Sequence, residues 1–244
     1  MNDFRIKTAT RPDVGARAGI DAGLRSYMMR VYNYMALGVA WTAIVAMFMA
    51  ANPALMATVA MGGMKWVLFF GVLGLGWFAP RLIFSGNAAM AYLAYGAYAT
   101  LWGLLISPMI AYYLGMNAGL VVRALLITAI TFGATSLAGY VTKRDLSGFA
   151  GFFMMASIGL LVAIVVNAIF FQSTMASLIT SILVVLLFSG ITAWETQQIK
   201  EMYVEGDLPA TARSKAIFGA FMLYGSFITM FIHILNILGI MSEE

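Results

Sequence analysis

Cysteine, histidine and charge are scarce in this chain of 244 residues. The absence of cysteine excludes disulfides, thiolate metal sites and cysteine nucleophiles. The single histidine excludes a metal site built from several histidines. Only 10% of the residues are charged, whereas 62% are hydrophobic, and this composition excludes a soluble domain of this length. The net charge of +4 does not indicate nucleic-acid binding, because basic residues are also needed to orient a membrane protein.

Apolar runs of about 20 residues dominate the chain, as expected for an all-α polytopic membrane protein whose main partner is the lipid bilayer. The sequence predicts one membrane domain over residues 27–241, between a polar tail at 1–26 and a short acidic tail at 242–244. Prolines that follow Asn52 and Ser107 predict helix ends there. The seven expected spans are residues 28–51, 64–84, 88–106, 117–141, 147–171, 175–199 and 216–240.

The basic residues predict the orientation of these spans. With the N-terminus in the cytoplasm, every lysine and arginine except Lys65 and Arg123 falls on the cytoplasmic side. We therefore expect residues 1–26 and the loop at Lys143–Asp145 to lie in the cytoplasm. Seven full spans place the C-terminus outside, whereas a re-entrant last segment would keep it in the cytoplasm.

Glu195 is the only carboxylate inside a predicted span. A charge in hydrocarbon costs at least about 3 kcal/mol, so it normally faces protein or water. One interpretation is a helix-end carboxylate that reaches the cytoplasmic interface and a basic loop. The other is an interior carboxylate that gates or binds a cation. Arg81, Lys143 and Arg144 lie on the same predicted side, and we expect an ion pair with Arg81 in particular.

The last span carries polar residues at helical spacing: Ser226, Thr229, His233 and Asn236 share one face. They are expected either to hydrogen-bond between helices or to line a water-filled path, in which His233 is the group that titrates near neutrality. We find no phosphate-binding loop, metalloprotease motif or nucleophile–base pair. The sequence therefore predicts neither an enzyme nor a resident cofactor.

Several stretches resemble the Bax inhibitor family of transmembrane proteins, and its bacterial members in particular. They cover about residues 22–240 in order, and the segment around Lys143 is the most specific. The matching stretches are Ala22–Met28, Phe132–Ala134, Thr142–Phe149, Gly190–Gln197, Leu223–Tyr224 and Phe227–Ile228.

The resemblance implies a seven-helix bundle with the last helix central and a proton-sensitive cation leak, with calcium as the usual ion. It also implies an inner-membrane location. In eukaryotic relatives the family goes with suppression of cell death, and some bacterial members bind and modulate a membrane protease. The family's two sensing aspartates correspond to Glu195 and Ser226 here. One carboxylate and a hydroxyl cannot share a proton as a carboxylate pair does, and Glu195 alone makes a weak calcium site.

Two functions are therefore expected as alternatives. The first is a cation leak pathway, with calcium as the candidate ion, between the sixth and seventh spans. The second is a non-conducting regulator that binds other membrane proteins, such as a membrane protease. Ion flux through the purified protein distinguishes them. Nothing in the sequence indicates an oligomeric state.

Overall fold

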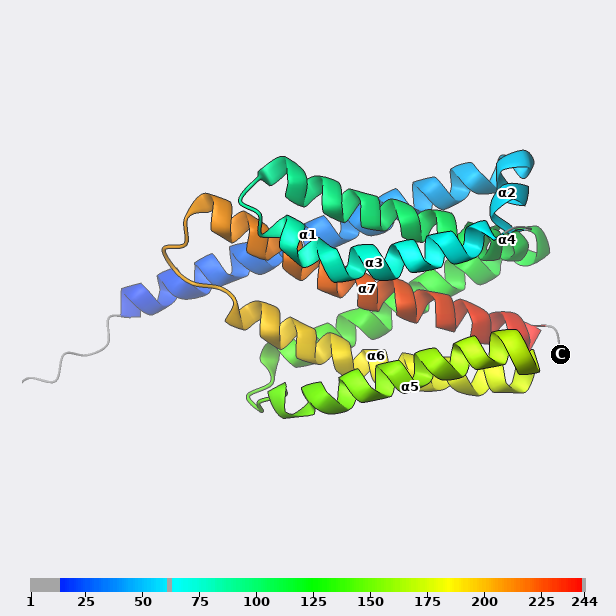
Figure 1. Cartoon of the computed structure of the whole chain (residues 1–244). Coiled ribbons are helices and arrows are strands. Elements are labelled where there is room, and N and C mark those ends of the chain that lie inside the picture. Colours follow the sequence, from blue (N-terminus) through cyan, green and yellow to red (C-terminus); the bar gives the residue numbers. More distant parts are fainter. Residues whose placement is uncertain (1–13, 61–62, 243–244) are drawn as a thin grey trace, which may run out of the picture.

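The computed structural model describes residues 14–60 and 63–242, and this part of the chain is helical, without strands (Figure 1). Six of its helices are long and apolar enough to cross a membrane, which confirms the all-α polytopic class. The short turn η1 (Ser147–Phe149) precedes α5, and the π-helical turn η2 (Asn167–Phe171) follows it. The helices are α1 (Val14–Ala50), α2 (Pro53–Ala60), α3 (Met64–Ile83), α4 (Ala88–Val141), α5 (Ala150–Val166), α6 (Thr174–Glu201) and α7 (Pro209–Ser242).

α4 contains both the third and the fourth predicted spans, and the helix end predicted at Ser107 is wrong. The helix continues through Pro108, which has no N–H for the carbonyl of Leu104. The Ser107 hydroxyl donates to that carbonyl at 2.7 Å instead. A serine beside a proline therefore satisfies the freed backbone group, as membrane helices allow.

The break in α4 comes later, at Asn117, where the fourth span was predicted to begin. Asn117 has an extended backbone (φ −161°, ψ 103°) inside the otherwise helical segment. Its side-chain Oδ1 accepts a hydrogen bond from the Gly119 N–H at 2.9 Å, which is the geometry of a helix N-cap. α4 turns back on itself, and its second part runs beside α6 (Figure 1).

Other boundaries also differ from the prediction. α1 begins at Val14, so part of the expected polar tail is helical, and residues 1–13 lie outside the described part. α2 was not predicted. α7 begins at Pro209 rather than Ala216, because proline is well suited to the first turn of a helix. Residues 243–244 of the acidic tail also lie outside the described part.

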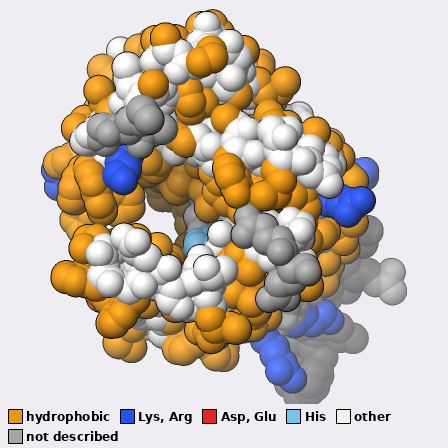
Figure 2. Space-filling model, turned by 90° about the vertical axis from the view of Figure 1, so that its right-hand side faces the viewer, with side chains coloured by type: hydrophobic (Ala, Val, Ile, Leu, Met, Phe, Trp, Pro, Cys, Tyr) orange, Lys and Arg blue, Asp and Glu red, His pale blue; other side chains and the backbone are white. Residues whose placement is uncertain are grey.

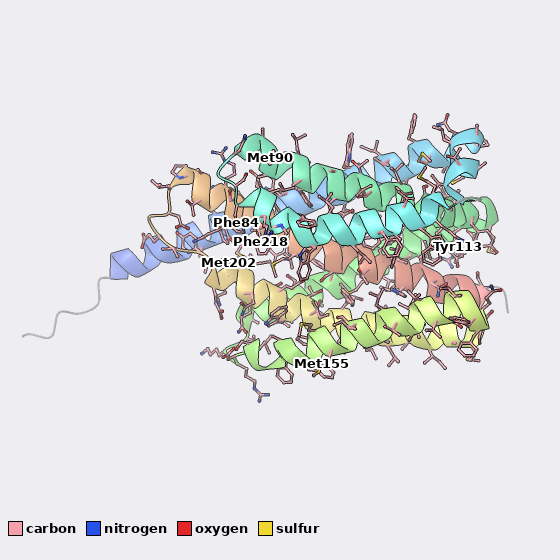
Figure 3. All side chains as sticks on the ribbon, in the orientation of Figure 1. Phe84, Met90, Tyr113, Met155, Met202 and Phe218 are labelled. Atoms are coloured by element: carbon pink, nitrogen blue, oxygen red, sulfur yellow. The ribbon has the colours of Figure 1, made fainter. Side chains whose placement is uncertain are left out.

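α7 is the most buried of the six spans. In its most apolar stretch 61% of the residues are buried, against at most 28% in each of the others and none in α5. It packs against α1, α3, α4 and α6. The ring centroids of Phe218, in the first part of α7, and of Phe84, after α3, lie 5.2 Å apart. Both residues are labelled in Figure 3. α5 packs mainly on α6, and Met155 lies on its outer side (Figure 3).

The second part of α4 approaches the backbone of α6 at Gly139. A methyl group at this position would collide with the carbonyl of Ala193. Small residues allow this close approach in membrane bundles. The contact holds α6 against α4 two residues before Glu195.

Candidate functional site

The centre of the candidate site is a hydrogen bond between α6 and α7. The hydroxyl of Ser226 donates to Oε2 of Glu195 at 2.7 Å. Glu195 is 9% exposed and Ser226 is 2% exposed. Apart from Glu201 at the last position of α6, Glu195 is the only carboxylate in the six described spans. The Glu195 side chain is therefore buried inside the bundle.

A chain of hydroxyl groups begins at Thr196, the residue after Glu195. Thr196 donates to the carbonyl of Thr192 in its own helix, and its hydroxyl is 2.8 Å from that of Ser136 on α4. Ser136 in turn lies 2.7 Å from the hydroxyl of Tyr32 on α1. These contacts tie three helices together around the carboxylate, so they position α6.

Gln197, two residues after Glu195, anchors the loop between α4 and α5. Its Nε2 donates to the carbonyl of Arg144 at 2.9 Å, and its Oε1 accepts from the N–H of Leu146 at 2.8 Å. Lys200 donates to the carbonyl of Tyr140 at 3.0 Å. No role was predicted for Gln197. Gln197 ends the Gly190–Gln197 motif, and Arg144 and Leu146 lie in the Thr142–Phe149 motif, but neither motif shows that the two segments meet.

Asp145 lies in this anchored loop and is exposed to solvent. Its Oδ1 accepts a hydrogen bond from the N–H of Ser147 at 2.8 Å. Hydrogen bonds from the Ser147 side chain and then from its backbone hold the pKa of Asp145 below its usual range. The carboxylate of Asp145 therefore remains charged beside Lys143 and Arg144 in this loop.

A polar cavity of about 510 Å³ opens at the end of the bundle where α7 ends at Ser242, which we call the C-terminal end. His233 and Asn236 line it. His233 Nδ1 lies 3.0 Å from the hydroxyl of Ser181, and Asn236 donates to Ser177 at 2.8 Å and to Ser181 at 2.9 Å. Figure 2 shows this end, with a hollow in which the pale blue of the single histidine is visible.

The polar stripe predicted on the last span is therefore divided. Ser226 binds Glu195, whereas His233 and Asn236 face the cavity at the C-terminal end. Thr229 donates to the carbonyl of Gly225 in its own helix at 2.8 Å. Met230, which is fully buried, contacts Ser189 of α6 between the two polar levels. The buried side chain of Met230 thus lies between the two polar levels.

Glu195 lines a second cavity, of about 500 Å³, between the start of α5 and the end of α6. Its other walls are almost entirely apolar and include Phe153, Phe188 and Trp194. It shares no lining residue with the cavity that contains His233. The carboxylate is therefore approached from the side of α5 rather than from the C-terminal end.

The ion pair predicted between Glu195 and Arg81 is wrong. Arg81 is exposed in the last turn of α3, which packs against α4 and α7. Within the described residues, the ion pair found within 4.0 Å joins Lys215 and Asp207 instead. An arginine near a helix end keeps its charge at the interface, so it does not follow the carboxylate into the bundle.

The described residues contain no group of three or more histidine, cysteine, aspartate or glutamate side chains that could hold a metal ion. Glu195 and Ser226 offer three side-chain oxygens between them. Calcium normally takes six to eight oxygen ligands. The pair could therefore hold a partly hydrated calcium ion only weakly.

Comparisons with known proteins agree on one family. The sequence profile described as inhibitor of apoptosis-promoting Bax1 matches residues 24–243. The inner membrane protein YbhL of Escherichia coli is 34% identical over 89% of this chain and 93% of its own length. An uncharacterised protein of Rickettsia prowazekii is 33% identical over 95% of this chain and 97% of its own. One from Deinococcus radiodurans is 38% identical over 88% and 90%.

Proposed function

The chain belongs to the Bax inhibitor family and is a multi-pass inner-membrane protein, and we propose that it forms a gated leak pathway for cations between α6 and α7. Calcium is the ion that we propose first. Glu195 is the group that meets the ion, and Ser226 positions it. The proposal includes no catalytic activity.

One observation carries this proposal: Glu195 is buried within a span, and no basic side chain of the described residues pairs with it. Among the described residues its side-chain partner is a neutral hydroxyl, and no base lies within ion-pair distance. An isolated carboxylate in hydrocarbon is costly, and residues of this kind commonly mark ion or proton pathways. A passing cation or a bound proton would supply the missing positive charge.

The proposed pathway is closed in this arrangement. The cavities of Glu195 and of His233 share no wall, and the contact between Met230 and Ser189 lies between them. Apolar constrictions of this kind gate channels by excluding water. Opening would require α6 and α7 to separate at the level of Met230.

The single carboxylate also limits the proposed chemistry. Strong calcium binding needs several charged oxygens, so we propose that this site binds calcium weakly. Weak binding lets an ion leave the site, as a leak pathway requires. pH sensing would depend on Glu195 alone at the contact between α6 and α7. His233, one level away, would add a charge to the cavity at the C-terminal end when protonated.

We also propose seven crossings, with the N-terminus in the cytoplasm and α7 at the centre. A crossing needs about 20 residues, and residues 88–116 and 118–141 of α4 each exceed that length on either side of the break at Asn117. Basic residues concentrate at the end of the bundle where α4 and α6 end, which we call the basic end, and this favours a cytoplasmic location for it. The burial of α7 supports its central place.

The test is calcium flux into liposomes that contain only the purified protein, measured with an internal dye between pH 6 and pH 8. We expect flux with the native chain and its loss in Glu195→Gln. Glu201→Gln is the matched control, because it removes the same charge from an exposed position at the end of α6. Absence of flux with the native chain would refute the leak, whereas flux unchanged in Glu195→Gln would refute the role of Glu195 in it. A co-purifying membrane protein would then favour the non-conducting regulator.

A further inference from the structure

Two cavities lie end to end along one side of α1, away from Glu195. The larger, of about 800 Å³, and the smaller, of about 310 Å³, both lie between α1 and the second part of α4. Phe227 of α7 lines both. We call the two cavities together the furrow.

The furrow runs along most of the bundle. On α1, residues 25–36 line the larger cavity and residues 39–47 line the smaller. On α4 the order is reversed, with Gly133 and Tyr140 in the larger cavity and Val121 and Leu125 in the smaller. Residues 106, 110 and 114 in the first part of α4 also line the smaller cavity. From Arg25 to Met47 a helix rises about 33 Å at 1.5 Å per residue, close to the hydrocarbon thickness of a bilayer.

The furrow opens sideways to the surface that faces lipid. Met28, Met35 and Phe227 on its floor are buried. Met29 and Leu137 on its rim are exposed. Its contents therefore come from the membrane rather than from water.

Polarity changes along the furrow in one direction. The polar side chains of the larger cavity include Arg25 at the basic end and Asn33 two turns further. The smaller cavity contains one polar side chain, Thr42, whose hydroxyl is already bonded to Tyr224 at 2.6 Å. Arg25 is exposed and forms no ion pair with the acidic side chains that the structure describes.

A positive group at one end and an apolar groove beyond it match the order of groups in a phospholipid. We propose that the furrow binds one phospholipid, with its phosphate at Arg25 and one acyl chain over Phe227. Lys143, three residues beyond the furrow residue Tyr140, adds positive charge at the same end and favours an anionic headgroup.

The order of polar and apolar groups identifies the occupant. An apolar helix from another protein would leave Arg25 and Asn33 of the larger cavity without a charged or polar partner. A phospholipid has a charged headgroup at one end and an apolar chain beyond it, as the two cavities require.

Gly133 provides a way to fill the furrow without disturbing the fold. It lines the larger cavity, and an added Cβ there would meet no atom within 4 Å. Gly133→Phe should place a ring in the space for the lipid. Gly74→Phe on α3 is the matched control, because an added Cβ at Gly74 also has free space and Gly74 lines neither cavity.

The experiment is native mass spectrometry of the full chain in detergent, titrated with phosphatidylglycerol. We expect one tightly held phospholipid on the native chain and on Gly74→Phe, and at least tenfold lower occupancy on Gly133→Phe. Arg25→Gln should bind phosphatidylglycerol about fivefold more weakly, the effect of one interfacial cation. Arg123→Gln, an exposed arginine outside the furrow, should bind as the native chain does.

Equal lipid occupancy on the native chain and Gly133→Phe would overturn the proposal. If Gly133→Phe does not fold, a photoreactive group on the acyl chain of phosphatidylglycerol tests the native protein in liposomes. Cross-links concentrated on the α1 and α4 segments of the furrow support the site. Cross-links spread evenly over exposed helices, α5 included, contradict it.

Discussion

Removing the Ser226 hydroxyl tests whether the bond between α6 and α7 stabilises the native protein. Ser226→Ala takes away the side-chain donor to Oε2 of Glu195 and leaves the rest of the contact unchanged. Both side chains are buried, so water does not replace the lost donor at low cost. We therefore expect Ser226→Ala to unfold more readily than the native chain.

The expected magnitude follows from the burial. Leaving a buried acceptor without its donor costs about 1–3 kcal/mol, and more when the acceptor is charged. For a chain of this size each kcal/mol corresponds to about 2–4 °C in the unfolding midpoint. The midpoint of Ser226→Ala should therefore fall by about 2–12 °C. Ser189→Ala is the control, because the Ser189 hydroxyl donates mainly to Val185 in its own helix.

The assay is thermal unfolding of purified protein in detergent, carried through a double-mutant cycle with Glu195→Gln. Glutamine keeps an oxygen acceptor but loses the charge, so Ser226→Ala should cost less in that background. We expect a coupling energy of about 1–2 kcal/mol. Effects that add within about 0.5 kcal/mol, or a Ser226→Ala shift no larger than that of Ser189→Ala, would refute the reasoning.

Three further predictions concern the surrounding fold. Gly139→Val should lower the unfolding midpoint in detergent, at a cost of about 1–3 kcal/mol, because its side chain collides with the backbone of α6. Gln197→Ala should speed hydrogen exchange at the Leu146 N–H while exchange in the spans is unchanged, since Gln197 holds that loop. Because the chain has no cysteine, single cysteines can be introduced in place of Lys143 or Asn117 and labelled from outside the cell. The cysteine at position 143 should not react and the one at position 117 should. The opposite result would reverse the proposed orientation.

The spans and the position of Glu195 could be predicted because hydrocarbon imposes simple rules on sequence. Long apolar runs marked the helices, and a lone carboxylate within one of them marked the candidate site. The same reasoning could place Ser226 on the polar face of the last span. The spacing of 3 and 4 residues could not show that Thr229 turns to its own backbone while His233 faces a separate cavity.

Other features depend on contacts that the sequence does not display. Pro108 indicated a helix end, but the neighbouring Ser107 hydroxyl occupies the carbonyl that the proline leaves free. Arg81 was matched to Glu195 by charge and by side of the membrane, although α3 does not bring it there. Gln197 is an ordinary polar residue by composition, and only the fold shows that it reaches the loop at Arg144.

The resemblance described above implies a carboxylate where this chain has Ser226, and restoring it provides a gain of function that can be measured. Ser226→Asp would place two carboxylates within hydrogen-bonding distance, where Ser226 now lies 2.7 Å from Glu195. Two such groups cannot both be ionised in a low-dielectric interior, so the pair would hold one proton that it releases as the pH rises. A second charged oxygen donor would also strengthen calcium binding. We therefore expect Ser226→Asp to bind calcium more tightly than the native chain and to show a steeper pH dependence of flux near neutrality. Ser226→Asn, which has a similar size and no charge, should show neither change. If the native chain already has strong, pH-switched calcium flux that Ser226→Asp leaves unaltered, then Glu195 does not depend on a carboxylate at this position, and the assignment of Ser226 as its working partner is wrong.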